Sequence, residues 1–363
     1  MEKKTPLYDC HVALEGKIVP FAGYLLPVQY KAGVIAEHMA VRTACGLFDV
    51  SHMGEVRLTG SDSLANLQMW LTNDMEGMAA GQVRYSPMCY YNGGVVDDLL
   101  VYKVNDEEYF IVVNASNRDK DVAWMEAHLT GKVKLTDESD TWAQIALQGP
   151  NAPAILAVLV SDEDTPKKYY SFAGRGMVGD IPCVISRTGY TGETGFELYC
   201  KSEHATALWN LLLDAGKNYG LLPCGLGTRD TLRLEAAMPL YGHEMDENIT
   251  PLETGLSFFV KTDKPAFIGK EAMLAAGKPL RKRVGIEITG RGIAREHCEV
   301  SNGDRPIGYT TSGTFSPFLQ KAIAMALVEA DSVQENDTVY IDVRGRSVEG
   351  KIVPLPFYKK LKK

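Results

Sequence analysis

The sequence lacks clustered cysteines, long apolar runs and a targeting segment. Its cysteines are odd in number, scattered, and never form C-x-x-C; they are Cys10, Cys45, Cys89, Cys183, Cys200, Cys224 and Cys298. A disulfide framework or a zinc site needs clustering, so we interpret them as reduced, mostly structural thiols. No apolar stretch approaches the length of a membrane span, and the N-terminus shows no signal peptide. We therefore expect a cytoplasmic protein with no membrane partner and no metal.

An excess of positive charge is also missing. The chain has 38 Lys and Arg against 46 Asp and Glu, which gives a formal net charge of −8. An acidic chain repels a phosphate backbone, and no basic stripe offsets this, so we expect no nucleic-acid partner. The one cationic run, residues 359–363, is more typical of a solvated terminus.

What the sequence contains is typical of a well-buried globular protein with several domains. Hydrophobic residues make up 45% and charged residues 23% of the 363 residues. A chain of this length exceeds one ordinary core, and domain sizes suggest roughly two or three domains. Disorder is therefore excluded as the main state of the chain.

Local patterns predict a mixture of strands and helices without strict alternation. Strands are expected at Val83–Tyr91, Val95–Val104, Tyr109–Val113, Ile181–Arg187 and Phe196–Cys200, with a tight hairpin at Asn92–Gly94. Helices are expected at Asp119–His128, Ala205–Ala215 and from about Thr228 to Ala237. After a linker at Ala275–Pro279, short apolar segments at Val284–Ile288, Ile323–Val328 and Val339–Val343 indicate a small β-barrel. The expected class is α+β.

The pair Asp97–Asp98 lies inside a strand that otherwise reads as buried. Successive strand side chains point to opposite faces, so the two carboxylates cannot share one solvated side. At least one is expected among apolar groups, where it could position a proton or hold a cationic centre. The alternative is that one of them accepts hydrogen bonds from the Asn92–Gly94 turn.

The loop Thr188–Gly195 has three glycines spaced by three and contains Tyr190. It joins two strands and opens no helix, so it is not a dinucleotide fingerprint. Either it is a flexible hairpin tip, or its glycines let the backbone approach a ligand that Tyr190 faces. Glu197 beyond it could accept two parallel hydrogen bonds from a guanidine-like edge, unless it faces solvent.

Two further positions carry charge or titrate. Arg229 stands near the start of a predicted helix, against the macrodipole. An anionic or carbonyl-bearing ligand would explain it, and so would an ion pair with Asp230 or a neighbouring acid. His52 is a lone histidine after Ser51, without any metal or serine-nucleophile motif, and reads as a hydrogen-bonded core or loop residue.

Many short segments, taken in order, resemble the T-protein family of the glycine cleavage system over essentially the whole chain. The segments are Thr5–Leu7, Phe48–Met53, Gly93–Leu99, Val113–Ala115, Leu147–Pro150, Arg187–Glu193, Gly225–Asp230, Gly242–Glu247 and Thr311–Pro317. The resemblance implies a cloverleaf-like, three-domain fold around a folate channel, ending in a β-barrel. Its implied lobes are residues 1–52 with 138–245, residues 53–137 with 246–277, and residues 278–363.

The resemblance also implies the reaction. An aminomethyl group on the lipoyl arm of H-protein gives its carbon to tetrahydrofolate, yielding 5,10-methylenetetrahydrofolate, ammonia and dihydrolipoyl H-protein. Asp98 matches the family's catalytic aspartate. Seven residues match folate-pocket positions: Met53, Tyr85, Val112, Asn114, Tyr190, Glu197 and Arg229. The family's C-terminal pocket contact has no clear counterpart in this sequence, and Tyr358 is our candidate for it. We expect tetrahydrofolate as the acceptor, no flavin, and a monomer.

Two alternatives remain. A relative could demethylate another donor onto folate, although such enzymes usually carry a fused flavin domain for which this chain has no room. A folate-binding protein of iron–sulfur assembly would carry a Lys-Gly-Cys-Tyr-x-Gly-Gln-Glu signature. Here Lys264–Glu271 has Ala266 in place of the cysteine, which argues against that reading.

Overall fold

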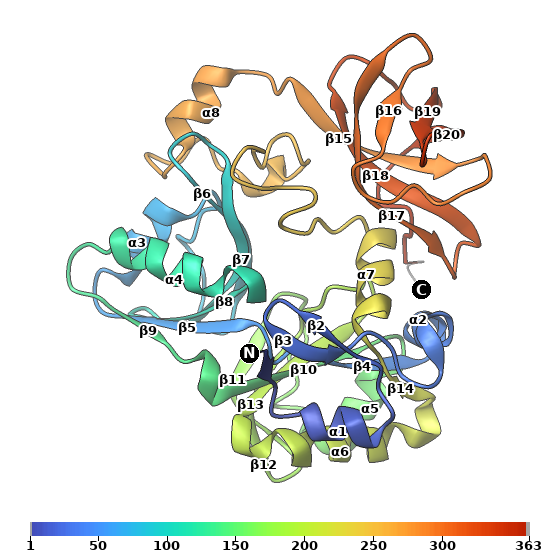
Figure 1. Ribbon diagram of the computed structural model, residues 1–363. Coiled ribbons are helices and arrows are strands. Elements are labelled where there is room, and N and C mark those ends of the chain that lie inside the picture. The colour runs from blue at the N-terminus through green and yellow to red at the C-terminus, as the bar shows by residue number, and fades with distance from the viewer. Residues whose placement is uncertain (1, 361–363) are drawn as a thin grey trace. The chain divides into compact units, whose positions relative to one another are not determined.

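A computed structural model describes residues 2–360, so the last three residues of the basic run 359–363 lie outside the described part. The chain forms two compact units. Unit 1 comprises residues up to 67, 75–85 and 99–229; unit 2 comprises 68–74, 86–98 and residues from 230 onward. The chain passes between the units within helices α3 and α7, within strands β6 and β7, and between residues 74 and 75, so each unit is discontinuous in sequence. Figure 1 labels the elements of both.

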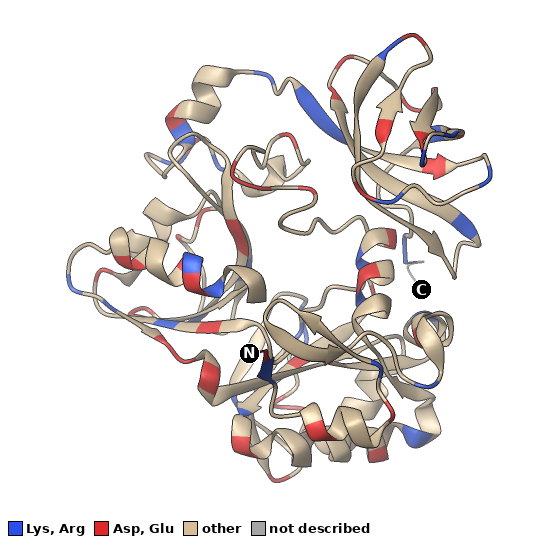
Figure 2. Ribbon diagram, in the orientation of Figure 1, with Lys and Arg blue, Asp and Glu red and all other residues tan. Residues whose placement is uncertain are grey.

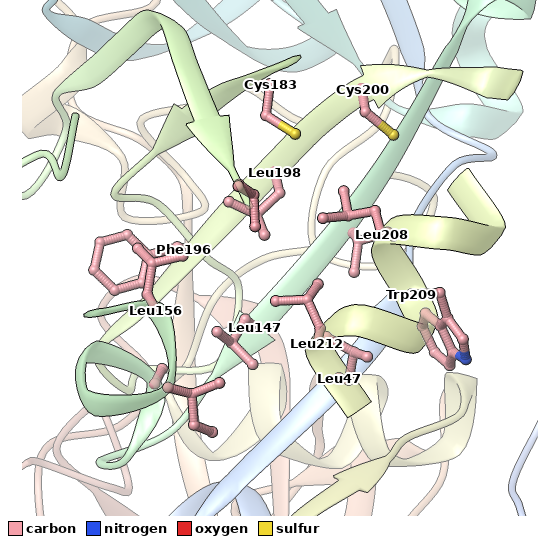
Figure 3. Close-up of a cluster of buried hydrophobic side chains, with 14 of the residues drawn as sticks. Leu47, Leu147, Leu156, Cys183, Phe196, Leu198, Cys200, Leu208, Trp209 and Leu212 are labelled. Atoms are coloured by element: carbon pink, nitrogen blue, oxygen red, sulfur yellow. The ribbon is translucent and has the colours of Figure 1, made fainter. Parts of the chain in front are cut away.

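Unit 1 contains a six-stranded sheet with the order β11-β12-β13-β10-β4-β14. Its strands are β4 (Cys45–Asp49), β10 (Trp142–Gln148), β11 (Phe172–Val178), β12 (Ile181–Ser186), β13 (Gly195–Lys201) and β14 (Leu221–Pro223). Helices α5 (Ala152–Leu159) and α6 (Ala205–Gly216) pack on this sheet. Leu208 and Leu212, four residues apart, are fully buried and Leu211 is half-buried, so one face of α6 meets the core. Figure 3 shows their side chains close to Leu147 and Leu198 of the sheet.

A second, five-stranded sheet has the order β6-β7-β8-β5-β9. Its strands are β5 (Gly54–Thr59), β6 (Val83–Cys89), β7 (Val95–Asn105), β8 (Glu108–Val113) and β9 (Lys134–Asp137). A small sheet with the order β1-β3-β2 precedes it, formed by β1 (Lys3–Lys4), β2 (Ile18–Phe21) and β3 (Tyr24–Pro27). The remaining helices of the first half are α1 (Tyr8–Ala13), α2 (Gly33–Thr43), α3 (Ser63–Trp70) and α4 (Arg118–Ala127).

Side chains from both large sheets of unit 1 meet in what we call the inter-sheet cluster. Its buried members are Val83, Tyr102, Phe110, Val112, Phe172 and Tyr199, and the half-buried Met53, Leu100 and Trp142 pack against them. The rings of Tyr102, Phe110 and Tyr199 meet edge to face, with centroids 5.6–5.8 Å apart. This cluster is therefore aromatic and brings phenol hydroxyls into the interior.

Unit 2 contains a closed six-stranded barrel with the order β15-β18-β17-β16-β19-β20. Its strands are β15 (Arg281–Ile288), β16 (Glu299–Ser301), β17 (Pro306–Ser316), β18 (Lys321–Glu329), β19 (Thr338–Asp342) and β20 (Ser347–Val353). The barrel core is aliphatic, built from alternating residues such as Val284, Ile286 and Ile288. Helices α7 (Leu226–Glu235) and α8 (Lys270–Ala276) precede the barrel in the chain.

The α+β class and the C-terminal β-barrel predicted from the sequence are confirmed. The meander Val83–Val113, the strands around the glycine loop and the barrel strands lie within a few residues of their predicted bounds. The last predicted helix begins at Leu226 instead of Thr228. Of the predicted hairpin glycines, Gly93 has a positive φ of 88°. The three-lobe boundaries stay a prediction.

Candidate functional site

Glu197 is a buried carboxylate on β13, the strand between β12 and β10. Its side chain is only 6% exposed, so the solvent-facing alternative is wrong. The hydroxyl of Thr188 donates to one carboxylate oxygen, and the amide Nε2 of Gln144 donates to the other at 3.0 Å. Burial raises the pKa of Glu197, against the lowering effects of the Thr188 bond, the charge of Arg229 and the Gln144 bond. Each oxygen keeps a further lone pair for a ligand donor.

A hydrogen-bonded network surrounds Glu197. The Gln144 amide also donates to the hydroxyl of Tyr199 at 3.2 Å, and that hydroxyl bonds the Tyr102 hydroxyl at 2.8 Å. The Oε1 of Gln144 is buried and has no hydrogen-bond partner among residues 2–360. Sequence reasoning missed Gln144, because its role depends on the register that places it opposite Tyr199. The network fixes the carboxylate through neutral donors.

Tyr190 and Arg229 are brought together. The guanidinium carbon of Arg229, in the first turn of α7, lies 4.7 Å from the Tyr190 ring centroid, a cation–π distance. Arg229 also acts electrostatically on Glu197, which places these three predicted residues in one region of unit 1. Asp230, the alternative ion-pair partner proposed for Arg229, accepts a hydrogen bond from Arg233 at 2.8 Å.

The glycine loop Thr188–Gly195 is held by the Gln148 side chain, which argues against the flexible tip; the approach of a ligand to its backbone stays a prediction. A Cβ at Gly189 or Gly195 would come within 2.0–2.4 Å of the Gln148 side chain. The Gln148 amide donates to the carbonyls of Thr188 and Phe196 and accepts from the Thr191 hydroxyl. Two glycines are therefore required by the passage of Gln148, and neither a flexible tip nor a ligand has to explain them.

The other predicted pocket residues lie on the second sheet. Met53 and Val112 pack in the inter-sheet cluster, Met53 directly before β5 and Val112 on β8. Asn114 follows β8 in an extended conformation and is half-buried. Tyr85 lies on β6 and is also half-buried. Met53 and Val112 thus share a cluster with Tyr199, the neighbour of Glu197 in the network.

Asp97 and Asp98 differ sharply in burial. Asp97 is fully buried, whereas Asp98 is half-buried. Asp97 shares its face of β7 with buried apolar side chains, which are Val95, Leu99 and Val101. The expected burial of one carboxylate is therefore confirmed, and it falls on the first of the pair. Asp98 belongs to the part of β7 that lies in unit 2, so it is not grouped with the unit-1 candidates.

The segment Tyr241–Ile249 supports the hairpin that leads to Asp97 and Asp98. The carbonyl of Glu247 accepts from the Asn92 side chain, and the backbone N–H of Val95 donates to the carbonyl of Asp246 at 2.8 Å. A Cβ at Gly94 would meet the Glu247 carbonyl at 1.9 Å, so this position requires glycine. The motif found at residues 242–247 thus serves to hold the acidic hairpin in unit 2.

His52 is buried, and its surroundings keep it neutral. Its exposed fraction is 3%, and its Nδ1 has no hydrogen-bond partner within the described chain, so the hydrogen-bonded interpretation is not supported for that atom. Burial lowers the pKa of His52 to about 4, helped by the charge of Arg229 and opposed by that of Asp49. Asp49 itself accepts from Thr5 and pairs with His11 at 2.7–2.8 Å.

The described residues contain no group of three or more His, Cys, Asp or Glu side chains placed to hold a metal. All seven cysteines are free, and five are buried. Among residues 2–360 no helix is long and apolar enough to cross a membrane. Figure 2 shows acidic and basic residues mixed along both units, with both signs on α7.

Both halves of the chain match models of one family. Residues 7–264 match the GCVT N-terminal domain, and residues 281–359 match the glycine cleavage T-protein C-terminal barrel domain. A curated aminomethyltransferase of Desulfitobacterium hafniense (strain DSM 10664 / DCB-2) is 52% identical over 362 residues, covering 99% of this chain and 98% of the relative. One of Bacillus cytotoxicus is 49% identical and covers 99% of each.

A solved structure agrees with these relatives. The crystal structure of glycine cleavage system aminomethyltransferase T from Bartonella henselae superposes with a TM-score of 0.91 at 31% identity, covering 99% of both chains. Fold and sequence together define an aminomethyltransferase, a transferase of one-carbon groups. The chain belongs to the glycine cleavage T-protein family.

Proposed function

We propose that this chain transfers the methylene carbon of aminomethyl-dihydrolipoyl H-protein to tetrahydrofolate, with release of ammonia. Family membership over nearly the full length supports the reaction class. The observation that carries the folate assignment is the buried Glu197 carboxylate, held from one side by neutral donors next to an aromatic ring and an arginine.

The residues of unit 1 fit the pterin ring of a folate. The 2-amino and N3–H groups of a pterin form a planar edge of donors, and a carboxylate accepts such an edge with two parallel bonds. Glu197 would hold this edge, while Tyr190 and Arg229 offer a flat face and a cation. Met53 and Val112 supply apolar contact, and Tyr85 and Asn114 supply polar groups at the strand ends.

Asp98 is the proposed catalytic residue. A carboxylate near the attacking nitrogen can orient it by a hydrogen bond and stabilise the positive charge that develops as the carbon is transferred. Its half-buried position on a rigid strand suits a group that must meet substrate while staying fixed. Asp97, which is fully buried, is proposed to be structural.

The reaction is tested by incubating the protein with tetrahydrofolate and aminomethyl-loaded H-protein, beside a non-aminomethyl donor such as sarcosine. We expect methylenetetrahydrofolate and ammonia with the loaded H-protein alone. Turnover of the other donor would move the function to a folate-dependent demethylase. Folate binding without any turnover would favour a non-catalytic folate-binding protein.

The Asp98→Asn variant should keep tetrahydrofolate binding and lose about 10²–10⁴-fold in kcat, because the amide is isosteric but cannot carry the negative charge. Single-turnover kinetics and equilibrium dialysis separate the two effects. Unchanged turnover would overturn the assignment of Asp98. Glu203→Gln, at a highly exposed carboxylate, is the matched control and should behave as the wild type.

Three further parts of the proposal come from the sequence. The chain is proposed to act as a monomer in the cytoplasm, with tetrahydrofolate as acceptor and without metal or flavin. Its lobes are proposed at residues 1–52 with 138–245, at 53–137 with 246–277, and at 278–363. Tyr358 is the proposed C-terminal contact; its backbone N–H bonds the carbonyl of Glu235 at 2.8 Å.

A further inference from the structure

Glu55 is a buried acid that the proposed reaction leaves unused. It lies on β5, its exposed fraction is 0%, and neither carboxylate oxygen has a hydrogen-bond partner among the residues the structure describes. An ionised carboxylate without donors in the interior costs several kcal/mol, which burial alone does not repay. Such a side chain needs either a proton or a partner.

The register of the strands shows where Glu55 points. Glu55 stands directly opposite Val112 in the pairing of β5 with β8, so both side chains lie on the same face of the sheet. Val112 belongs to the inter-sheet cluster, together with Tyr199 from the other sheet. Glu55 therefore enters the layer between the two sheets.

Gln144 enters the same layer from the opposite side. It stands opposite Tyr199 in the pairing of β10 with β13, and its amide donates to Tyr199 and to Glu197. These two donations fix the amide orientation, since a flipped amide would turn its oxygen toward the Glu197 carboxylate. The remaining Oε1 of Gln144 is a buried acceptor that has no donor among the described residues.

One layer thus holds an acid without a partner and an acceptor without a donor. Stacked sheets lie about 10 Å apart, a gap that two long side chains extending from opposite sheets can close. Glu55 acts electrostatically on Tyr199, whose hydroxyl accepts a hydrogen bond from the Gln144 amide. If Glu55 carries a proton, its O–H can donate a hydrogen bond to the Oε1 of Gln144.

Burial is the main reason why Glu55 favours the protonated form. Arg118 is the one cation among the groups that act on Glu55, and its guanidinium is bonded to Asp137 and Asp140 at 2.7–2.9 Å. Burial raises the pKa of Glu55 well above its usual range; the charge of Arg118 opposes this shift, and the charges of Asp137 and Asp140 add to it.

We propose that Glu55 is a protonated carboxylic acid whose O–H bonds the Oε1 of Gln144, directly or across one buried water, and so positions Glu197 for folate. The positioning of Glu197 for folate rests on the proposed function, whereas the protonation of Glu55 and its contact with Gln144 do not. Glu55 is a positioning residue, because it acts on the ligand only through Gln144 and Glu197.

Protonation is tested first, by infrared difference spectra at neutral pH of the wild-type protein against Glu55→Gln. We expect the carbonyl band of a carboxylic acid, present in the wild type and absent from the variant. A difference spectrum that contains carboxylate bands alone would overturn the proposal. Ser63→Ala is the control. It removes a buried hydroxyl that has no hydrogen-bond partner within residues 2–360, and it should retain the carbonyl band.

The contact is tested by a double-mutant cycle on tetrahydrofolate affinity, with Kd from calorimetry. Glu55→Leu and Gln144→Leu should each weaken binding about tenfold, and the double variant should be no weaker than either single one, since both break the same chain of bonds. Glu55→Gln should rescue affinity, because its amide can still donate. Fold-changes that multiply, or equal affinity for Glu55→Leu and wild type, would contradict the coupling. Absence of tetrahydrofolate binding by the wild type would refute the proposed function, and the infrared band would still decide the state of Glu55.

Discussion

The barrel core and the inter-sheet cluster are two buried regions that contain different kinds of side chain. The buried members of the barrel core cluster are aliphatic, for example Val300, Ala324 and Ile341, and the barrel strands close on themselves. The inter-sheet cluster is aromatic, and hydroxyl, amide and carboxyl groups from Tyr102, Gln144 and Glu55 reach into its layer.

The difference separates packing from binding. Aliphatic cores gain stability from the area they remove from water, and nothing in them discriminates between ligands. Buried polar groups cost free energy unless they are satisfied, and they are retained where their orientation matters. In the inter-sheet cluster, this chain therefore gives up some stability to hold polar side chains in fixed orientations. The following substitutions test whether the barrel core serves packing and the inter-sheet cluster serves binding.

The largest effect on stability is expected in the barrel. Ile286→Ala removes a fully buried side chain and should lower the free energy of unfolding by about 2–5 kcal/mol, because a cavity is left behind. Folate affinity of the folded variant should not change. Lys351→Ala, at an exposed position of β20, should shift stability by less than about 0.5 kcal/mol in chemical denaturation. If Ile286→Ala weakened folate binding, the separation between a packing core and a binding cluster would be wrong.

Acidification should weaken unit 1 through His52. Its pKa is about 4 in the folded state, below the usual 6.5, so the unfolded state takes up the proton first as pH falls. Stability is present above pH 6.5 and is lost between about 6.5 and 4, up to about 3 kcal/mol for this group. Hydrogen exchange across this pH range should show unit 1 losing protection, and His52→Gln should remove that part of the slope. An identical slope in the variant would show that other groups cause the loss.

Glu197→Gln should weaken tetrahydrofolate binding about tenfold to hundredfold, because a charge-assisted bond is worth about 1.5–3 kcal/mol. The effect on unfolding should be smaller, since removing a buried charge offsets the lost bonds. Calorimetry and denaturation measured on the same sample compare the two. A variant that loses stability but keeps its affinity would make Glu197 a structural residue.

The smallest effect is expected at Tyr190. Tyr190→Leu removes the ring under Arg229 and should cost about 0.5–1 kcal/mol, a few-fold in folate affinity. Tyr190→Phe keeps the ring and should bind like the wild type. If Tyr190→Phe loses as much folate affinity as Tyr190→Leu, the hydroxyl and not the ring face makes the contact.

The parts of the fold with local patterns could be predicted from the sequence. Alternation and the Asn92–Gly94 turn gave the meander, because a hairpin is fixed by neighbouring residues. Alternation also indicated that Asp97 and Asp98 point to opposite faces. It could not tell which of the two carboxylates is fully buried, since that depends on what packs against the sheet.

The site was harder to predict, because it depends on pairs distant in sequence. Glu55 and Gln144 carry no motif, and their meeting in one layer follows from two separate strand registers. The glycines of the loop after β12 suggested a ligand, whereas they accommodate Gln148 from a strand some forty residues earlier.

The closure of the barrel also sets an order of events during synthesis. Its first strand, β15, pairs with β20, the last strand in the chain, through contacts such as Gly285 with Val353. While the protein emerges from the ribosome, β15 must wait for β20, so one of its edges stays open until nearly the whole barrel has been translated. A chaperone that binds nascent strands would find β15 exposed for longest, and a ribosome stalled before Ser347 would present a barrel that cannot close.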